Sequence, residues 1–363
     1  MTRSLRVAVP ASLFGTGTMN GRGRMWHEVL TRLAPSCDLR SVPDEALGGG
    51  RRARLSQWSQ RSPDVWLFDG HNGPLPVRQP QVIQLHEAPW TEPETMATLD
   101  PHFIEVVVEP SRRAAQAAAA VVCPSESSKR QIVEDSGVAP ERVFVAHHGV
   151  DHAIFRPGLS GGAAVAAAHG ADPALPYLLT VASLHPRKNL LALREAFVQL
   201  VGEGFPHQLL IVGGPAYGRF DGDDLVAAVS AEVPGAPGRL VLVPFGLSDE
   251  DVAALMGGAT AFCLPSLSEG FGLPAMEAMA CGVPAVLSDR AALRELGQDA
   301  AVLVEPTAAG IAEGLRSLLV DPVRAGEVGS AGIARARDFT WDRCAAAWLR
   351  AIEAGAAVRP LAV

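Results

Sequence analysis

One stretch near residue 270 restricts the folds open to this chain more than any other. The apolar run Thr260–Leu264 is short enough to be a buried strand, and Gly270 and Gly272 follow it in a loop. Pro274 is favoured in the first turn of a helix, and Gly282 is the kind of residue that ends one. A strand, a glycine loop and a helix start leave backbone N–H groups that can bind an anion.

Two carboxylates, Glu269 and Glu277, flank this predicted anion site. Free amides hold phosphate oxygens, and carboxylates accept hydrogen bonds from sugar and ribose hydroxyls. The stretch Ser266–Pro284 therefore fits a ligand that carries both groups. The alternative is a tight turn with two solvated Glu side chains. For either Glu taken alone, this alternative is about as well supported as ligand binding.

Short apolar runs and helical patterns alternate along the chain in two series. The first series runs from Leu5–Val9 to Arg142–Ala146, and the second from Tyr177–Val181 to Ala301–Val304. A segment rich in Pro, Gly and Ala separates them, between Phe155 and Pro176. Alternation of this kind is typical of α/β proteins with doubly wound, mostly parallel sheets.

At 363 residues the chain is long enough for two domains. We predict two Rossmann-like domains, over residues 1–155 and 172–340, that face each other across a cleft. We expect a helix within residues 341–363 to pack back on the first domain. Ligand loops lie at the carboxyl ends of the strands in such domains, so the cleft is the expected active site.

Charge and composition narrow the class of partner. The net charge is −8, but residues 1–150 hold 16 basic and 16 acidic side chains, so the excess negative charge lies in the remainder. An acidic chain without a block of Lys and Arg argues against nucleic acid. No apolar stretch approaches the roughly 18 residues needed to span a membrane. Attachment at the inner membrane face stays open, and the oligomeric state is not indicated.

The five cysteines are dispersed and include no Cys-x-x-Cys pair. Such a set indicates reduced thiols in a cytoplasmic protein. They are Cys37, Cys123, Cys263, Cys281 and Cys344.

The amino-terminal series contains two candidate site segments. A glycine loop with Gly21, Gly23 and Arg24 follows the first predicted strand, but its glycine spacing departs from a dinucleotide fingerprint. His86 and Glu87 end the predicted strand Val82–Leu85, at the edge of the sheet where ligands bind. A structural role for His86 is the alternative, and we favour a functional one slightly.

The stretch Glu269-Gly-Phe-Gly-Leu-Pro-x-x-Glu277-Ala-Met-Ala-x-Gly282-x-Pro284 resembles the Glu–seven residues–Glu motif of the retaining nucleotide-sugar glycosyltransferases of family 4. That family has the GT-B fold, and the resemblance covers most of the chain. The loop Gly21–Arg24 resembles its amino-terminal glycine loop, and His86-Glu87 its His-Asp pair. Pro186-Arg-Lys-Asn189 resembles a subgroup of bacterial mannosyl- and rhamnosyltransferases.

The resemblance implies catalytic roles for Glu269, His86 and Lys188. Lys188 would face the donor diphosphate and stabilise the charge that develops as the sugar leaves. Glu269 would bind donor-sugar hydroxyls near the reacting carbon, and His86 would contact the sugar from the other domain. In such enzymes Lys and Arg replace a metal ion, so we expect neither a metal nor a cofactor.

The resemblance also implies a set of donor-binding residues. The amides of the predicted helix start would hold the sugar or phosphate, Glu277 would accept the ribose hydroxyls, and the loop after Leu240–Val243 would hold the base. The set comprises Ser183, Arg187, Lys188, Phe245, Gly246, Phe271, Gly272, Leu273 and Glu277.

Ser183 departs from the family pattern, because many members carry an Arg there as a second diphosphate clamp. Arg187 or Arg24 could supply the missing charge. A weakened or lost donor site is the alternative that this position raises.

The predicted function is therefore transfer of a hexose from a nucleotide diphosphate sugar to an acceptor hydroxyl, by metal-independent front-face displacement. We favour mannose, and a GDP-linked over a UDP-linked donor. The acceptor would be a glycan, a lipid-linked sugar or a small natural product. The alternatives are a catalytically decayed sugar-nucleotide-binding protein, an NAD-dependent enzyme, and a GT-B phosphorylase or epimerase. Only two lysines, Lys129 and Lys188, are available for a pyridoxal phosphate linkage.

Overall fold

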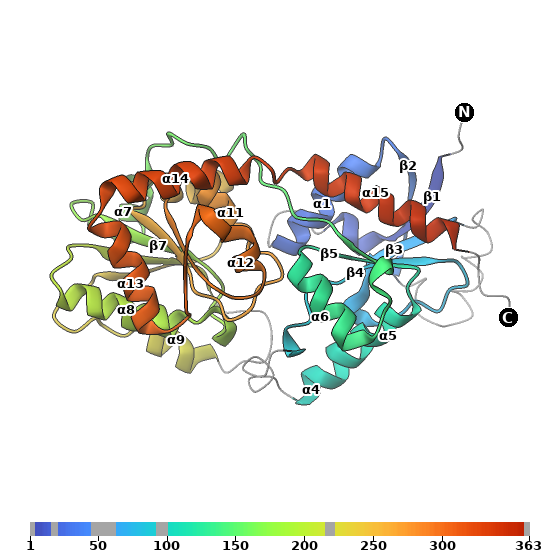
Figure 1. Cartoon of the computed structure of the whole chain (residues 1–363), viewed down its shortest axis with the longest axis horizontal. Coiled ribbons are helices and arrows are strands. Elements are labelled where there is room, and N and C mark those ends of the chain that lie inside the picture. Colours follow the sequence, from blue (N-terminus) through green and yellow to red (C-terminus); the bar gives the residue numbers. More distant parts are fainter. Residues whose placement is uncertain (1–3, 16–20, 45–62, 92–100, 215–221, 359–363) are drawn as a thin grey trace. The chain divides into compact units, whose positions relative to one another are not determined.

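The structure, a computed structural model, describes residues 4–15, 21–44, 63–91, 101–214 and 222–358 (Figure 1). The chain divides into two compact units. The first unit comprises Met1–Gly149 and Thr340–Val363, and the second comprises Val150–Phe339. The Pro-, Gly- and Ala-rich segment between Phe155 and Pro176, which separates the two predicted series, lies in the second unit and contains helix α7 (Gly162–Ala168).

The first unit is built on a six-stranded parallel sheet with the strand order β2-β1-β3-β4-β5-β6. Its central strands are buried on both faces, as parallel sheets covered by helices require. The strands are β1 (Leu5–Pro10), β2 (Cys37–Val42), β3 (Val65–Asp69), β4 (Gln81–Gln84), β5 (Ala120–Cys123) and β6 (Val143–Val145). Among its described residues before position 150, this unit has the α-helices α1 (Gly21–Leu33), α4 (Pro101–Phe103), α5 (Glu109–Ala117) and α6 (Glu126–Ser136).

The last helix, α15 (Trp341–Ala357), belongs to the first unit although it ends the described chain. It packs beside α1 and across strands β3 to β6 (Figure 1). Trp348 of α15 meets Trp26 of α1 with ring centroids 5.3 Å apart. An added Cβ at Gly355 would lie 2.5 Å from Val82, so α15 approaches β4 closely where it has no side chain.

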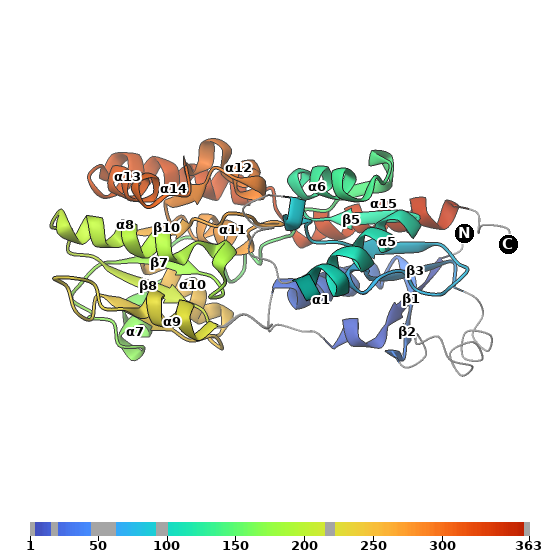
Figure 2. The same cartoon turned by 90° about the horizontal axis from the view of Figure 1, so that it is seen from below.

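The second unit has its own six-stranded parallel sheet, in the order β12-β11-β10-β7-β8-β9, with helices above and below it in Figure 2. The strand order reverses direction between β7 and β10, which are neighbours in the sheet. The strands are β7 (Tyr177–Val181), β8 (Gln208–Val212), β9 (Leu240–Val243), β10 (Ala261–Leu264), β11 (Ala285–Ser288) and β12 (Val302–Val304). The remaining helices are α8 (Leu190–Gly202), α9 (Gly222–Ser230), α10 (Asp249–Gly258), α11 (Leu273–Ala280), α12 (Ala291–Gly297), α13 (Ala308–Leu319) and α14 (Pro322–Ala336).

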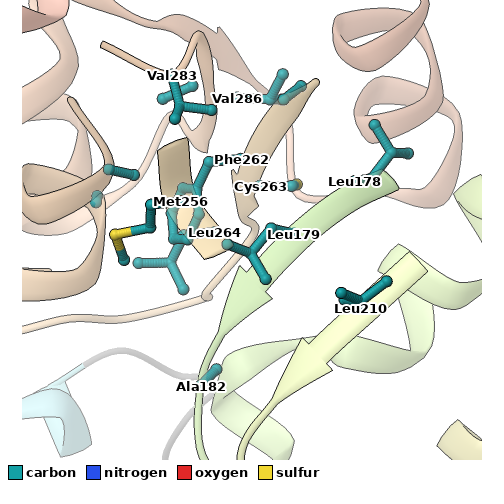
Figure 3. Packing of buried hydrophobic residues seen from close by; sticks show 14 of the residues in the cluster. Leu178, Leu179, Ala182, Leu210, Met256, Phe262, Cys263, Leu264, Val283 and Val286 are labelled. Carbon is teal, nitrogen blue, oxygen red and sulfur yellow. The ribbon is translucent and has the colours of Figure 1, made fainter. Parts of the chain in front are cut away.

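Apolar side chains from neighbouring strands fill the core of the second unit (Figure 3). Leu178 and Leu179 of β7, Leu210 of β8 and Phe262 of β10 are fully buried there. Burial of each such side chain stabilises the unit by about 1.5–3 kcal/mol relative to exposure. This core fixes the strand ends from which the site loops start.

The predicted α/β architecture of two Rossmann-like domains is confirmed. The strands β7 and β9 have the bounds expected from the sequence. The sequence did not indicate β2, whose polar residues suit an edge strand with a half-exposed face, or α14. Ser248 caps α10, since its hydroxyl accepts from the amide of Asp251.

Candidate active site

The predicted anion site of the second unit lies where β10 ends and α11 begins. Gly272 is the residue before α11 and has φ +101°, a conformation that strongly favours glycine. A Cβ added there would lie 2.6 Å from Cδ2 of Leu293 on α12. Gly272 has no side chain with which to cap α11, so no side-chain oxygen caps the start of this helix.

Glu269 lies in the same loop and is held by two cations. Lys188 Nζ donates to Glu269 Oε1 at 2.5 Å, and Arg187 Nη1 donates to Oε2 at 3.2 Å. Ser266 adds a third hydrogen bond, from its hydroxyl to Oε1 at 2.7 Å. The residue is only 7% exposed, so this carboxylate is buried with its charge compensated.

These contacts decide the ionisation of Glu269. Burial acts to raise its pKa, but the positive charges of Lys188 and Arg187 and the hydrogen bonds outweigh burial and lower the pKa to about 2. Glu269 is therefore ionised at neutral pH. A carboxylate engaged on both oxygens is also a poor nucleophile.

The two cations lie on a short 3₁₀ turn, Pro186–Lys188, that follows β7. His185 Nδ1 accepts from the amide of Arg187 at 3.2 Å and so caps the turn. Burial, and then the neighbouring charges of Arg187 and Lys188, lower the pKa of His185 to about 4. The imidazole is therefore neutral at pH 7, as this hydrogen bond requires.

Asn189 joins the cation turn to two neighbouring loops. Its amide Nδ2 donates to the carbonyls of Pro265 at 3.2 Å and Pro306 at 2.7 Å. Its backbone has φ +56°, which Asn tolerates better than most residues. The amide of Leu267 also donates to the carbonyl of Arg187 at 2.8 Å. Lys188 and Glu269 therefore lie on two loops that are joined by hydrogen bonds.

The other predicted donor residues occupy the same edge of the second sheet or the helix beyond it. Glu277 lies within α11 and is 5% exposed, and its charge helps to raise the pKa of the nearby thiol of Cys281, after the larger effect of burial. Phe245 follows β9 and is 56% exposed, with its ring against the bare backbone of Gly214 after β8. Gly246 has φ +110°. Ser183 lies between β7 and the cation turn.

The remaining predicted site residues belong to the first unit. Gly21, Gly23 and Arg24, which we expected in a glycine loop, lie in the first turn of α1. The neighbouring Arg22 pairs with the buried Asp69 at the end of β3, with Nε 3.0 Å from Oδ2. His86 follows β4, and its ring meets His148 edge-on with centroids 5.3 Å apart. The roles of these residues stay predictions.

The structure thus brings Glu269 together with Arg187 and Lys188, from which it is distant in sequence. Sequence reasoning did not single out Ser266 or Asn189 as parts of this cluster. The only available signals were their positions, three residues before Glu269 and directly after Lys188.

Two family models match the chain, one in each unit. The model "Glycosyl transferases group 1" matches residues 165–335, and "Glycosyltransferase Family 4" matches residues 33–154. The two models together match most of the chain, and both units are therefore similar to glycosyltransferases of the family 4 type. The first match contains the cation turn, Glu269 and α11, so the residues that carried the sequence resemblance lie inside it.

Relatives with assigned functions match part of the chain. It is 37% identical over 172 residues to O-antigen chain mannosyltransferase B of Escherichia coli, over 46% of this chain and 43% of that protein. It is 32% identical over 246 residues to the MMP alpha-(1->4)-mannosyltransferase of Mycolicibacterium hassiacum, over 66% of this chain and 55% of the relative. The chain spans about half the length of these relatives.

Solved structures share the fold of this chain. Sucrose-phosphate synthase from Thermosynechococcus elongatus superposes with a TM-score of 0.74 at 18% identity, over 97% of this chain and 98% of that one. Anabaena HepE in complex with UDP and glucose gives 0.73 at 17% identity, over 96% and 99%. These likenesses, with the two six-stranded parallel sheets, confirm the GT-B fold.

Within the described ranges, no helix is both long enough and apolar enough to cross a membrane. Nor do three or more His, Cys, Asp or Glu side chains gather there in a way that could hold a metal ion. The expectations of a metal-free reaction and of a cytoplasmic location stay predictions.

Proposed function

We propose that the protein is a retaining hexosyltransferase that moves a sugar from a nucleotide diphosphate sugar to an acceptor hydroxyl. The observation that carries the proposal is the cluster of Lys188, Arg187 and Glu269 beside the start of α11. The cluster bears one net positive charge, and the neighbouring helix start directs its dipole and amides toward an anion. A diphosphate is the kind of group that such a site attracts.

Lys188 is the residue that we assign to the leaving group. In the ligand-free protein it donates to Glu269, and Arg187 donates to the same carboxylate. A bound diphosphate would offer Lys188 further acceptors, while Arg187 and Ser266 would keep Glu269 in place. The positive charge of Lys188 would then stabilise the phosphate oxygen that gains charge as the sugar departs.

The reaction that we propose is a front-face displacement. The acceptor oxygen forms a bond to the anomeric carbon on the face from which the nucleotide leaves, and the bond from that carbon to the phosphate oxygen breaks. The acceptor proton passes to a phosphate oxygen. The low pKa of Glu269, at about 2, and its three hydrogen-bond donors support this route over a covalent glycosyl–enzyme intermediate.

For the donor we propose GDP-mannose, and for the acceptor a glycan, a lipid-linked sugar or a small molecule. The names of two relatives, both mannosyltransferases, support mannose. The UDP bound to HepE makes a UDP-linked donor the second candidate for the comparison. Phe245, with its exposed ring after β9, is the residue that we assign to the nucleobase.

Hydrolysis of the donor tests this proposal without knowledge of the acceptor. GDP-mannose and UDP-glucose are incubated with the wild-type protein and with Lys188→Ala, and the released sugar is followed by NMR from the first turnover. We expect slow release of the α-anomer by the wild-type protein and a loss of about 100-fold in Lys188→Ala. Initial release of the β-anomer would contradict retention. Nucleotide binding without turnover in either protein would favour a decayed binding protein instead.

A further inference from the structure

Phe339 is the last residue of the second unit, and its carbonyl holds the segment by which the chain enters that unit. The amide of Val150, the first residue of the unit, donates to this carbonyl at 3.1 Å. His152 Nε2 hydrogen-bonds to the same oxygen at 3.2 Å. The entering and leaving segments of the second unit are therefore joined at one atom.

The ring of Phe339 packs against the loop of residues 265–272 between β10 and α11, which we call the donor loop. It meets the ring of Phe271 edge-on, with centroids 5.7 Å apart and planes at 60°. Phe339 is 5% exposed and Phe271 is 4% exposed, so the contact is buried. Phe271 directly precedes Gly272, and Gly272 is the residue before the first turn of α11.

Arg335 makes a second contact with the Phe339 ring. The guanidinium of Arg335 lies 4.9 Å from the ring centroid and donates to the carbonyls of Glu295 and Leu296 at the end of α12. Leu296 and Leu293 of the same helix border Gly272. The donor loop, the end of α12 and Phe339 therefore form one packed block.

We infer that Phe339 is a positioning residue that links the donor loop to both segments by which the chain passes between its units. The inference rests on the proposed function, because it assigns donor phosphate to the amides beside Phe271. Protein interiors are close-packed, so displacement of one buried side chain displaces its neighbours. A nucleotide that orders Phe271 must therefore also order Phe339 and the hydrogen bond from Val150.

Amide hydrogen exchange at Val150 tests this link directly. Exchange is measured in the full chain with no nucleotide, with saturating GDP and with saturating UDP. We expect the nucleotide that binds to slow exchange at Val150 about tenfold, because opening of that hydrogen bond becomes coupled to binding. By the reciprocity of linkage, Phe339→Leu should weaken nucleotide binding, measured by calorimetry, about fivefold or more.

Three variants separate this role from a general loss of packing. Phe271→Leu should abolish the effect of nucleotide on Val150 exchange, as Phe339→Leu should. Phe197→Leu, at a buried Phe of α8 in the same core, should lower the melting temperature and leave both the nucleotide Kd and the Val150 response unchanged.

The outcomes distinguish the link through Phe339 from the proposed function. A wild-type protein that binds GDP or UDP without any change at Val150 would overturn the link and leave the proposed function standing. A Phe197→Leu variant that lost affinity as much as Phe339→Leu would also overturn it. A wild-type protein that bound neither nucleotide would overturn the proposed function and the link with it. If Phe339→Leu does not fold, the wild-type and Phe271→Leu exchange data still decide.

Discussion

At the scale of the residue, the site depends on how Glu269 is held. The sequence indicated Glu269 and Lys188 as functional residues, because the motif around each is specific. It could not indicate that they are bonded to each other, since 80 residues separate them and only the sheet brings their loops together. Nor could it reveal Ser266 and Asn189 as supports, because a Ser and an Asn in a loop have many uses.

The two motif carboxylates should have separable roles. Glu277→Gln removes an acceptor for nucleotide hydroxyls and should raise the donor Kd about tenfold with a small change in kcat. Glu269→Gln leaves Lys188 and Arg187 without their carboxylate and should lower kcat about 100-fold with a smaller change in Kd. Calorimetry and donor hydrolysis on both variants measure the split. If both variants changed only the melting temperature, neither carboxylate would be functional.

Ser183 offers a gain-of-affinity experiment. Ser183→Arg adds a third cation next to Arg187 and Lys188 and should tighten binding of GDP or UDP several-fold, with an advantage that shrinks as salt is raised. Ser183→Met, of similar length without charge, is the matched control. Equal affinities for the two variants at low salt would mean that position 183 does not face the diphosphate.

The pKa of Glu269 also predicts a pH dependence of stability. It is lowered to about 2 in the folded protein, so the folded state binds fewer protons than the unfolded state at mildly acid pH. The stability that this carboxylate contributes is fully present above its unfolded value of about 4.5 and is lost as pH falls through about 2. Urea unfolding of the wild-type protein and Glu269→Gln should therefore differ less at pH 3 than at pH 7, by about 2 kcal/mol. A difference independent of pH would contradict the assigned ionisation.

At the scale of the element, the start of α11 depends on one backbone conformation. Sequence patterns predicted the strand, the loop and the helix here, because Gly and Pro mark such boundaries. They failed at β2, a polar edge strand, and at α14, whose small residues and glycines weaken a helical pattern. The helix start is the element that the proposed function needs most.

Gly272→Ala should damage this element. The substitution forces a side chain into φ +101° and toward Leu293, so we expect a loss of about 2 kcal/mol in stability and weaker nucleotide binding by tenfold or more. Gly326→Ala is the matched control, because Gly326 lies in α14 with open space around it and should gain up to about 1 kcal/mol. Unchanged binding in Gly272→Ala would exclude the start of α11 from the donor site.

At the scale of the whole molecule, the sequence predicted two Rossmann-like domains from two series of alternating elements. It could not give the strand orders, because parallel neighbours such as β7 and β10 are joined only through long-range pairing. Nor could it give the residues at which the chain passes between units. Those residues, Gly149 to Val150 and Phe339 to Thr340, follow from packing that involves both ends of the second unit.

The central claim is that Lys188 belongs to a nucleotide diphosphate site, and the chain supplies its own control. Lys129, on α6, is the only other lysine, so Lys188→Gln and Lys129→Gln remove the same charge at two places. Calorimetric titration of GDP and UDP measures the effect. The account predicts that the wild-type protein and Lys129→Gln bind one of these nucleotides alike, whereas Lys188→Gln binds it at least tenfold more weakly. Equal affinity of all three proteins would contradict it.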